Sequence, residues 1–384
     1  MGTNVTMRLG SLFSGIGGLD RGLELAGMEV VWQVENDPSC ARVLERHWPG
    51  VERHGDIGQV DPGRLRPVDV VCGGFPCQDL SVAGRRAGLD GGRSGLFHEF
   101  VRIADSQPAA WVLVENVPGL LSSQGGEDFG IVLRELTGFW PSVPDGGWRS
   151  AGCCAGPKRV VAWRVLDSQY FGVAQRRDRV FLVGGPRTCG VGPVEVLLEP
   201  EGVPRHPPAR GAAGQVAPTI PASGAGTSRP GGPKSGSEDE FVVVNESPSL
   251  SRSPSASGTG TKNDDTHDTY VIQDVRGHTT DSAQNGPRWS QGNLSYTLGA
   301  VERHGVAYGI NNQPIPDVVR RLTPRECERL QAFPDDWTAF DAAGKPIADS
   351  PRYRMLGNAV TVSVSEWIGK RLMAWFRAQD SPRP

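Results

Sequence analysis

The sequence predicts an α/β protein in which helices cover both faces of a parallel sheet. Two observations indicate this architecture. Short, continuous apolar runs, such as residues 68–72 and 180–183, are typical of strands that are buried on both sides. Stretches with apolar residues at helical spacing lie between several of these runs, as the crossover connections of a parallel sheet require.

The N-terminal half supplies most of the expected elements. A strand at residues 8–13 is followed by the glycine turn Ser14-Gly-Ile-Gly-Gly. Leu19 and Leu23 then share one face of a helix that Gly27 is placed to end. The further elements expected are a helix at 40–48, strands at 30–34, 68–72, 111–114, 160–166 and 180–183, and a last helix near 364–376 that packs back onto the sheet.

The middle of the chain differs in composition from its two ends. From about residue 184 to residue 305 it is rich in Gly, Pro, Ser and Thr and poor in aromatic residues, as a disordered linker would be. It also holds a loose repeat of short β-prone pieces beside turn residues, at 216–224, 246–253 and 294–300. We therefore expect a small, loop-rich β domain in preference to a linker.

The composition argues against several classes of protein. Hydrophobic residues make up 38% of the 384 residues, and no apolar run approaches the ~18–20 residues that a membrane span needs. The first eight residues contain no signal-peptide core, so neither a membrane protein nor a secreted protein is expected. A net charge of −3 argues against binding nucleic acid by bulk charge, but it leaves room for a local basic cleft. The seven cysteines are scattered and odd in number, so we expect them to be reduced.

Residues at the carboxyl ends of the expected strands predict a nucleotide pocket, because open α/β sheets bind ligands there. The turn after the first strand carries Gly15, although a plain tight turn would also use glycine. Glu35 ends the second strand, where an acid can accept both hydroxyls of a ribose. Asp56 is placed to accept from the exocyclic amine of adenine, although either acid could be a solvated surface carboxylate. The turn lacks the GxGxxG pattern of dinucleotide-binding folds, so S-adenosylmethionine (SAM) fits better than NAD.

Cys77 is the candidate nucleophile. It lies on the loop Gly73-Gly-Phe-Pro-Cys-Gln, which follows a strand and is stiffened by Pro76. We expect four other cysteines to be inert core residues: Cys40, Cys72, Cys189 and Cys327. The vicinal pair Cys153-Cys154 has no partner at metal-ligand spacing, so no metal is expected.

Charged residues follow two more strands of the expected sheet. Glu115 comes after the strand at 111–114 and is expected to face the same crevice, where a buried carboxyl group can donate a proton. Arg177 and Arg179 alternate just before the strand at 180–183, so both are expected to point one way, into the site or toward phosphates. An exposed basic turn is the alternative.

Six motifs, in this order, resemble those of the DNA cytosine-5 methyltransferases. They are Phe13-Ser-Gly-Ile-Gly-Gly, Pro76-Cys-Gln, Glu115-Asn-Val, Gln175-Arg-Arg-Asp-Arg, Arg321-Leu-Thr-Pro-Arg-Glu and Leu356-Gly-Asn-Ala-Val. The resemblance covers nearly all of the chain except its middle. It implies a Rossmann-like, SAM-dependent methyltransferase fold with a small, irregular, β-rich target-recognition domain. The expected division is 1–185 for the SAM-binding catalytic domain, 186–345 for target recognition and 346–384 for the return to the catalytic domain.

The resemblance also implies roles for individual residues. Cys77 would be the nucleophile and Glu115 the acid at N3 of the base, with Arg177 and Arg179 supporting the site. The residues that match SAM-site positions are Phe13, Gly15, Gly17, Glu35, Asp56, Pro76 and Asn358. The residues expected to contact DNA are Gln78, Ser81, Arg276 and Arg288.

Two features depart from the family pattern. Leu80 stands where family members often carry an aromatic residue. Extra sequence lies between the Glu115 and Gln175 motifs, at about residues 122–160, and includes Trp140, Trp148 and the vicinal cysteines. A surface loop that touches DNA and a passive insertion both remain open for it.

The predicted function is transfer of a methyl group from SAM to C5 of a flipped-out cytosine in a specific duplex DNA sequence. The reaction would pass through a covalent Cys77–C6 adduct and use no metal. The expected partner is double-stranded DNA. A cognate restriction endonuclease is compatible with the resemblance, and we expect a monomer in the cytoplasm of a bacterial cell or a phage-infected host. The alternatives are a tRNA cytosine-5 methyltransferase, a NAD- or FAD-dependent oxidoreductase and a non-catalytic DNA-binding relic.

Overall fold

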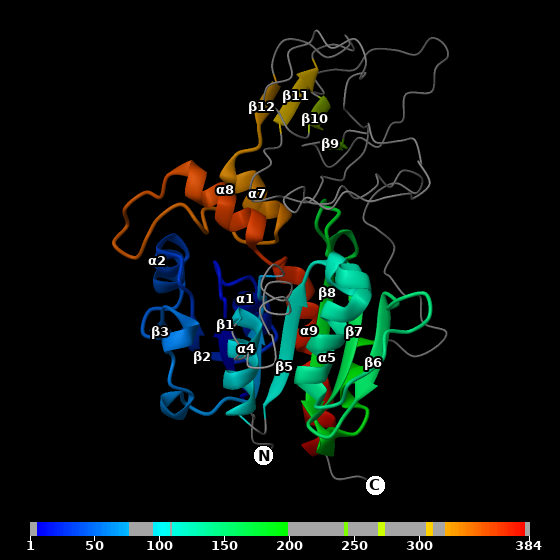
Figure 1. Ribbon diagram of the computed structural model, residues 1–384. Coiled ribbons are helices and arrows are strands. Elements are labelled where there is room, and N and C mark those ends of the chain that lie inside the picture. The colour runs from blue at the N-terminus through cyan, green and yellow to red at the C-terminus, as the bar shows by residue number, and fades with distance from the viewer. Residues whose placement is uncertain are drawn as a thin grey trace, which may run out of the picture.

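An eight-stranded mixed sheet forms the centre of the protein (Figure 1). The computed structural model describes residues 6–76, 95–107, 110–198, 242–244, 268–272, 305–309 and 319–380. The strand order is β3-β2-β1-β4-β5-β8-β7-β6. These strands are β1 (Arg8–Leu12), β2 (Glu29–Val34), β3 (Glu52–His54), β4 (Val70–Gly73), β5 (Trp111–Asn116), β6 (Ala151–Ala155), β7 (Arg159–Asp167) and β8 (Asp178–Pro186).

The expectation of a wholly parallel sheet is wrong for its last three strands. The first five strands in the order pair in parallel, whereas β5–β8, β8–β7 and β7–β6 pair antiparallel. The reason is the length of the connections. Only residues 168–177 join β7 to β8 and only 156–158 join β6 to β7, and such short links cannot return the chain to the same end of the sheet.

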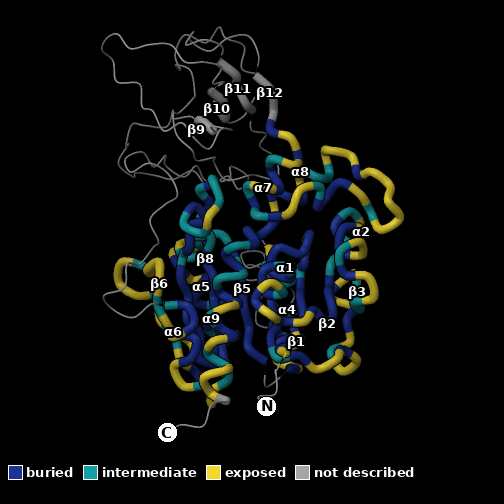
Figure 2. The backbone as a smooth tube through the Cα atoms, turned by 180° about the vertical axis from the view of Figure 1, so that it is seen from behind, coloured by how far each residue is buried: buried dark blue, intermediate teal, exposed yellow. Residues whose placement is uncertain are grey.

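Helices cover both faces of the sheet, as the sequence predicts. The described helices are α1 (Gly18–Leu25), α2 (Pro38–His47), α4 (Leu96–Asp105), α5 (Glu127–Thr137), α6 (Gly192–Leu197), α7 (Pro324–Leu330), α8 (Asp349–Asn358) and α9 (Val362–Asp380), of which α7 and α8 lie beyond one end of the sheet (Figure 1). Alternate residues of β5 face opposite layers. Leu113 joins one core with apolar residues of α1, α6 and α9, while Val112 and Val114 join the other with residues of α4 and α5. Figure 2 shows the resulting pattern, with buried strands inside and exposed residues on the outer helices.

Local sequence signals set several helix boundaries. Asp37 begins α2, because its carboxylate accepts from the N–H of Ser39 at 2.7 Å and Pro38 occupies the first helical position. The helix after the first strand ends where predicted, since Gly27 follows it with φ 101°. The last helix is also confirmed, and its Ile368 and Leu372 are buried in the core.

Much of the segment 122–160 is built into the large sheet and one of its helical layers, so it is not a passive insertion. Contact of this segment with DNA stays a prediction. The segment holds α5 and β6. The ring of Trp148 packs edge-on against Phe129 and Trp163, and its N–H donates to the carbonyl of Gly126 at 2.8 Å. Trp140 differs, because its side chain is 65% exposed beneath the guanidinium of Arg134.

A second, smaller sheet lies in the middle segment. Its strands β9 (Val242–Val244), β10 (Asp268–Ile272), β11 (Gly305–Gly309) and β12 (Val319–Arg321) pair antiparallel in the order β12-β11-β10-β9. Figure 1 shows this sheet beyond the end of the large sheet that carries α7 and α8. The three copies of the loose repeat lie outside the described residues.

Both ends of the predicted middle domain, 186–345, pack against the large sheet. The exact domain boundaries stay a prediction. Val196 and Leu197 of α6 are buried in the catalytic core. Leu322, Cys327 and Phe333, which follow the small sheet in the sequence, are buried in the same core. The described residues up to Leu197 and from Leu322 onward therefore belong to the core of the large sheet.

Three of the cysteines expected in the core are buried there, namely Cys40, Cys72 and Cys327. Burial raises the pKa of each of these thiols, which makes them poor nucleophiles. Cys189 is only half-buried.

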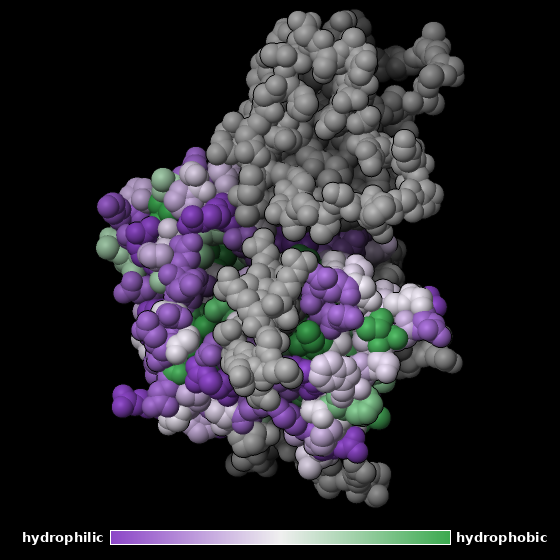
Figure 3. Space-filling view, viewed as in Figure 1, coloured by the Kyte–Doolittle hydropathy of each residue, from purple (hydrophilic) through white to green (hydrophobic). Residues whose placement is uncertain are grey.

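The surface of the described part on the face in Figure 3 is mainly hydrophilic, with separate apolar areas. None of the described helices has the length and apolar character to span a membrane.

Candidate active site

The carboxyl ends of β1, β2, β4 and β5 meet at one edge of the large sheet. Strand β8 runs the opposite way, so its beginning lies at this same edge. The register pairs Glu115 with Phe181 and Asn116 with Val180. The antiparallel pairing therefore brings the turn that carries Arg177 and Arg179 beside the end of β5.

Glu115 and Arg179 form an ion pair at this edge. The distance between Glu115 Oε1 and Arg179 Nε is 3.0 Å, and both side chains are largely buried. A Cβ atom at Gly74 would lie 2.8 Å from Glu115 Oε2, so the loop after β4 passes close to the carboxylate. The guanidinium compensates the carboxylate's charge and fixes its position next to that loop.

Arg177 points into the protein, toward the C-terminal part of the chain. One of its Nη atoms donates to the carbonyls of Gly357 at 3.0 Å and Ala359 at 2.9 Å. Burial, and secondly the positive charge of Arg179, lowers the pKa of the Arg177 guanidinium well below its ordinary value. The alternative of an exposed basic turn is wrong, because Arg177 is buried and Arg179 is paired with Glu115.

The glycine turn after β1 is fixed by Glu35. Glu35 accepts from the N–H of Gly15 through Oε2 and from the N–H of Asp37 through Oε1, each at 2.7 Å. Burial raises the pKa of Glu35, although these two hydrogen bonds oppose the rise. Phe13, Gly15 and Gly17 all have positive φ, of 52°, 57° and 83°.

The surroundings of this turn fit an adenosine-bearing ligand. A Cβ atom at Gly15 would meet no other atom within 4 Å, so open space lies beside this residue of the turn. Each carboxylate oxygen can accept a further hydrogen bond, as the two hydroxyls of a ribose would supply. Glu35 and Gly15 are the residues that would hold the ribose of SAM.

The other expected SAM residues occupy exposed positions around the same edge. Asp56 caps a short 3-10 turn, where its Oδ1 accepts from the N–H of Gly58 at 2.9 Å. Asn358 is the last residue of α8, directly after the Gly357 carbonyl that Arg177 contacts. Pro76 is exposed at the end of the described part of its loop.

Several expected residues lie outside the described residues. They are Cys77, Gln78, Ser81, Arg276 and Arg288. Within the described ranges, no group of three or more His, Cys, Asp or Glu side chains is arranged to hold a metal ion.

Asn116 is a site residue that we did not single out from the sequence. It is buried, and its Nδ2 donates to the carbonyl of Phe75 at 2.9 Å. This bond ties the end of β5 to the loop that leads into Cys77. A polar residue that ends an apolar strand, next to Glu115, was the signal that could have found it.

Asp20 was missed as well, and it lies behind the glycine turn. Its two oxygens accept from Ser11 Oγ at 2.9 Å and from Gln33 Nε2 at 2.8 Å, and Ser14 Oγ donates to Ser11 Oγ. The network joins β1, α1 and β2 under the turn. Burial raises the pKa of Asp20 to about 6. The signal in the sequence was an acid inside the otherwise apolar turn-and-helix segment.

The comparisons with known proteins identify the family. A family model described as C-5 cytosine-specific DNA methylase matches residues 7–189 and 229–374. The chain belongs to this family. It is therefore a member of the DNA cytosine-5 methyltransferases, and the resemblance drawn from the six motifs is confirmed.

Three related methyltransferases align with nearly the whole chain. A protein of Escherichia phage P1 named DNA N-6-adenine-methyltransferase is 31% identical over 94% of this chain, which spans 60% of that protein. Type II methyltransferase M2.BsuMI of Bacillus subtilis is 30% identical over 95% of this chain and 75% of its own length. Type II methyltransferase M.MthTI of Methanothermobacter thermautotrophicus is 28% identical over 96% of this chain and 97% of its own length.

The fold is shared with a solved methyltransferase structure. A crystal structure described as a DNA modification methyltransferase encoded within an Escherichia coli prophage superposes with a TM-score of 0.54. The match covers 97% of this chain and 100% of that one, at 18% identity. The Rossmann-like methyltransferase fold predicted from the sequence is thus confirmed.

The buried Asp20 predicts a specific pH dependence of stability. Its pKa of about 6 in the folded protein exceeds the ordinary value of 3.8, so folding favours the protonated form. The resulting stability is complete below pH 3.8 and is lost as the pH rises through about 6. Relative to Asp20→Asn, the wild type should therefore lose roughly 2–3 kcal/mol of unfolding free energy between pH 4.5 and 7.5.

Urea unfolding at a series of pH values measures this difference. Asp61→Asn is the matched control, because Asp61 is exposed and its curve should run parallel to that of the wild type. Parallel curves for Asp20→Asn and wild type would show that Asp20 carries no such penalty.

Proposed function

We propose that the chain transfers a methyl group from SAM to C5 of a cytosine in duplex DNA, through a covalent bond between Cys77 and C6. The observation that carries the proposal is the Glu115–Arg179 pair, which lies against Gly74, three residues before Cys77. A nucleophile loop and a held carboxylate are thereby neighbours at the ligand-binding edge of the sheet. Membership of the C-5 methylase family supports the same chemistry.

The chemistry of cytosine explains why these residue types are needed. C5 is a weak nucleophile in the aromatic ring. The Cys77 thiolate donates an electron pair to C6, and the electrons of the C5–C6 double bond make C5 an enamine carbon. Glu115, held by Arg179, would take up a proton from solvent and pass it to N3, which neutralises the negative charge that the ring gains. SAM supplies the methyl group as an electrophilic sulfonium.

The reaction ends when the ring regains its double bond. A base removes the C5 proton, the electron pair re-forms the C5–C6 bond, and the sulfur of Cys77 leaves C6. The target atoms lie inside the stacked duplex, so the cytosine has to swing out of the helix, which costs a few kcal/mol. Asn116 holds the loop before Cys77 by its bond to the Phe75 carbonyl, and this supports a role for Asn116 in orienting the segment that leads to the nucleophile.

A second candidate is methylation at N6 of adenine, which the name of the phage P1 relative suggests. Transfer to an exocyclic amine needs no thiol, because the amine nitrogen itself attacks the methyl group. Cys77 and Glu115 would then have no role in the chemistry. The family match and these two residues favour cytosine, and the chain spans only 60% of the phage protein.

We assign the choice of DNA sequence to the unit that contains β9–β12. This unit separates two parts of one catalytic domain, and its acidic and basic residues nearly balance. Without bulk positive charge, it has to recognise DNA by individual side chains at base edges. Arg276 and Arg288 are the candidates for these contacts.

Cys77→Ala should abolish methylation while leaving SAM binding intact, because only the nucleophile is lost. DNA with 5-fluorocytosine at the target should form a stable covalent complex with the wild type, since fluorine cannot leave as a proton does. Gel electrophoresis under denaturing conditions detects the complex. Cys153→Ala, at an exposed cysteine of β6, is the control that should keep full activity. Activity retained by Cys77→Ala would rule out the mechanism.

Glu35→Ala should weaken SAM binding by about 1–3 kcal/mol, the scale for hydrogen bonds to a charged group. The control is Glu29→Ala, at the exposed opposite end of the same strand, which should bind SAM as the wild type does. Isothermal titration calorimetry measures both. Unchanged SAM affinity with reduced DNA affinity would mean that Glu35 binds DNA.

Exchange of residues 199–318 for the corresponding segment of a relative should move the methylated sequence and leave the Cys77 chemistry unchanged. Each bidentate contact between arginine and guanine that is exchanged changes discrimination by about 1–3 kcal/mol. Base-resolution methylation sequencing identifies the site that is modified. An active chimaera that still methylates the original site would place specificity in another part of the chain.

A further inference from the structure

Trp337 contacts the glycine turn of the cofactor pocket from the C-terminal part of the chain. Its indole N–H donates to the carbonyl of Ile16 at 2.9 Å. Ile16 lies between Gly15 and Gly17, and the two residues of the bond are 321 positions apart in the sequence. The glycine turn, which is open at Gly15, is therefore held at Ile16 by this indole.

The ring of Trp337 is held by His47, the last residue of α2, and by Trp48, which follows this helix. The imidazole of His47 stacks on it, with centroids 3.4 Å apart and an interplanar angle of 3°. His47 Nε2 also lies 2.7 Å from the carbonyl oxygen of Trp337, so this nitrogen carries the proton and donates. Trp48 packs edge-on against Trp337 and also fills the space next to Gly17, where a Cβ atom would lie 2.4 Å from its ring.

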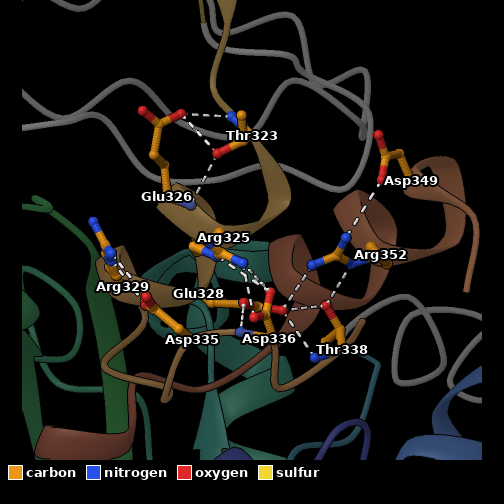
Figure 4. A network of polar contacts seen from close by, with 10 residues as sticks. All are labelled: Thr323, Arg325, Glu326, Glu328, Arg329, Asp335, Asp336, Thr338, Asp349 and Arg352. Atoms are coloured by element: carbon orange, nitrogen blue, oxygen red, sulfur yellow. Dashed lines mark hydrogen bonds and ion pairs between the residues drawn. The ribbon is translucent and has the colours of Figure 1, made fainter. Parts of the chain in front are cut away.

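One buried carboxylate holds the backbone on both sides of Trp337. Glu328 of α7 accepts from the N–H of Asp336 at 2.7 Å and from the N–H of Thr338 at 2.8 Å (Figure 4). Its charge is compensated by Arg352 of α8, at 3.1 Å. The side chain of Glu328 is fully buried, so these contacts have no competition from water.

The remaining pairs of this network lie at the surface. Figure 4 shows Arg325 paired with Asp336 and Arg329 paired with Asp335, each at distances of 2.7–2.8 Å. These side chains are about half exposed, so the pairs contribute little to stability. The buried contacts of Glu328 are the ones that set the position of Trp337.

We propose that Trp337 is a positioning residue for the methyl donor. Its bond to Ile16 holds the glycine turn in the shape that receives SAM, and Glu328 holds Trp337 in place. The inference rests on the proposed function, because it concerns the same cofactor pocket. Trp337 acts through the turn and does not itself contact the reacting atoms.

The test compares two identical substitutions. Trp337→Phe keeps an aromatic ring against His47 but removes the N–H donor. Trp163→Phe removes an equivalent bond. The indole N–H of Trp163, in β7, donates to the carbonyl of Arg149 at 3.0 Å, and the two tryptophans are buried to a similar degree. Both variants should lose a similar amount of thermal stability. If Trp337 had a purely structural role, the two substitutions would therefore change SAM binding to the same extent.

Calorimetry with SAM, in the absence of DNA, separates the roles. Trp337→Phe should raise the dissociation constant for SAM roughly five- to tenfold, as expected for the loss of one hydrogen bond that shapes the site. Trp163→Phe should bind SAM as the wild type does. In methylation assays, Trp337→Phe should raise KM for SAM by a similar factor and lower kcat much less.

Two results would overturn the inference alone. In the first, the wild type binds SAM and Trp337→Phe binds it equally tightly. In the second, Trp163→Phe weakens SAM binding as much as Trp337→Phe does. A wild type that binds no SAM would overturn the proposed function, and the inference with it.

Discussion

The antiparallel pairing of β5 with β8 is the constraint on which the candidate active site depends. A parallel partner at this position would begin at the opposite edge of the sheet, far from the end of β5. The antiparallel register instead places the residues before Val180 beside Glu115 and Asn116. One ion pair and one bond from a side chain to the backbone then connect the end of β5 with the beginning of β8 and with the loop after β4.

The cofactor turn depends on buried polar groups in the same way. Of its three residues with positive φ, Gly15 and Gly17 adopt this conformation readily, whereas at Phe13 it is costly unless neighbouring contacts hold it. Those contacts come from three directions: Glu35 binds the turn on its ligand side, Asp20 supports it from behind through Ser11, and Trp337 holds it from the C-terminal segment. These contacts determine the shape of the turn, and both carboxyl groups among them are hydrogen-bonded.

The sequence predicted the parts of this arrangement that local patterns encode. Apolar runs located the central strands to within a few residues, and helical spacing located α1 and α9. Strand direction was mispredicted for β7 and β8, because a continuous apolar run looks the same in either direction, and the short link at 168–177 carried the missing information. Glu115 and Arg179 were named separately, but their ion pair depends on strand register. The bond from Trp337 to Ile16 joins residues 321 positions apart and no local pattern indicates it. Cys77 lies outside the described residues, so its place beside Glu115 stays a prediction.

The most direct test of the account is the identity of the methylated base. Duplex DNA incubated with the protein and SAM that carries a deuterated methyl group is digested to nucleosides and analysed by mass spectrometry. The account predicts the label in 5-methyldeoxycytidine alone, because the enamine formed by Cys77 makes C5 the only carbon that attacks. Label in N6-methyldeoxyadenosine, or DNA without label when the protein binds SAM and DNA, would contradict it.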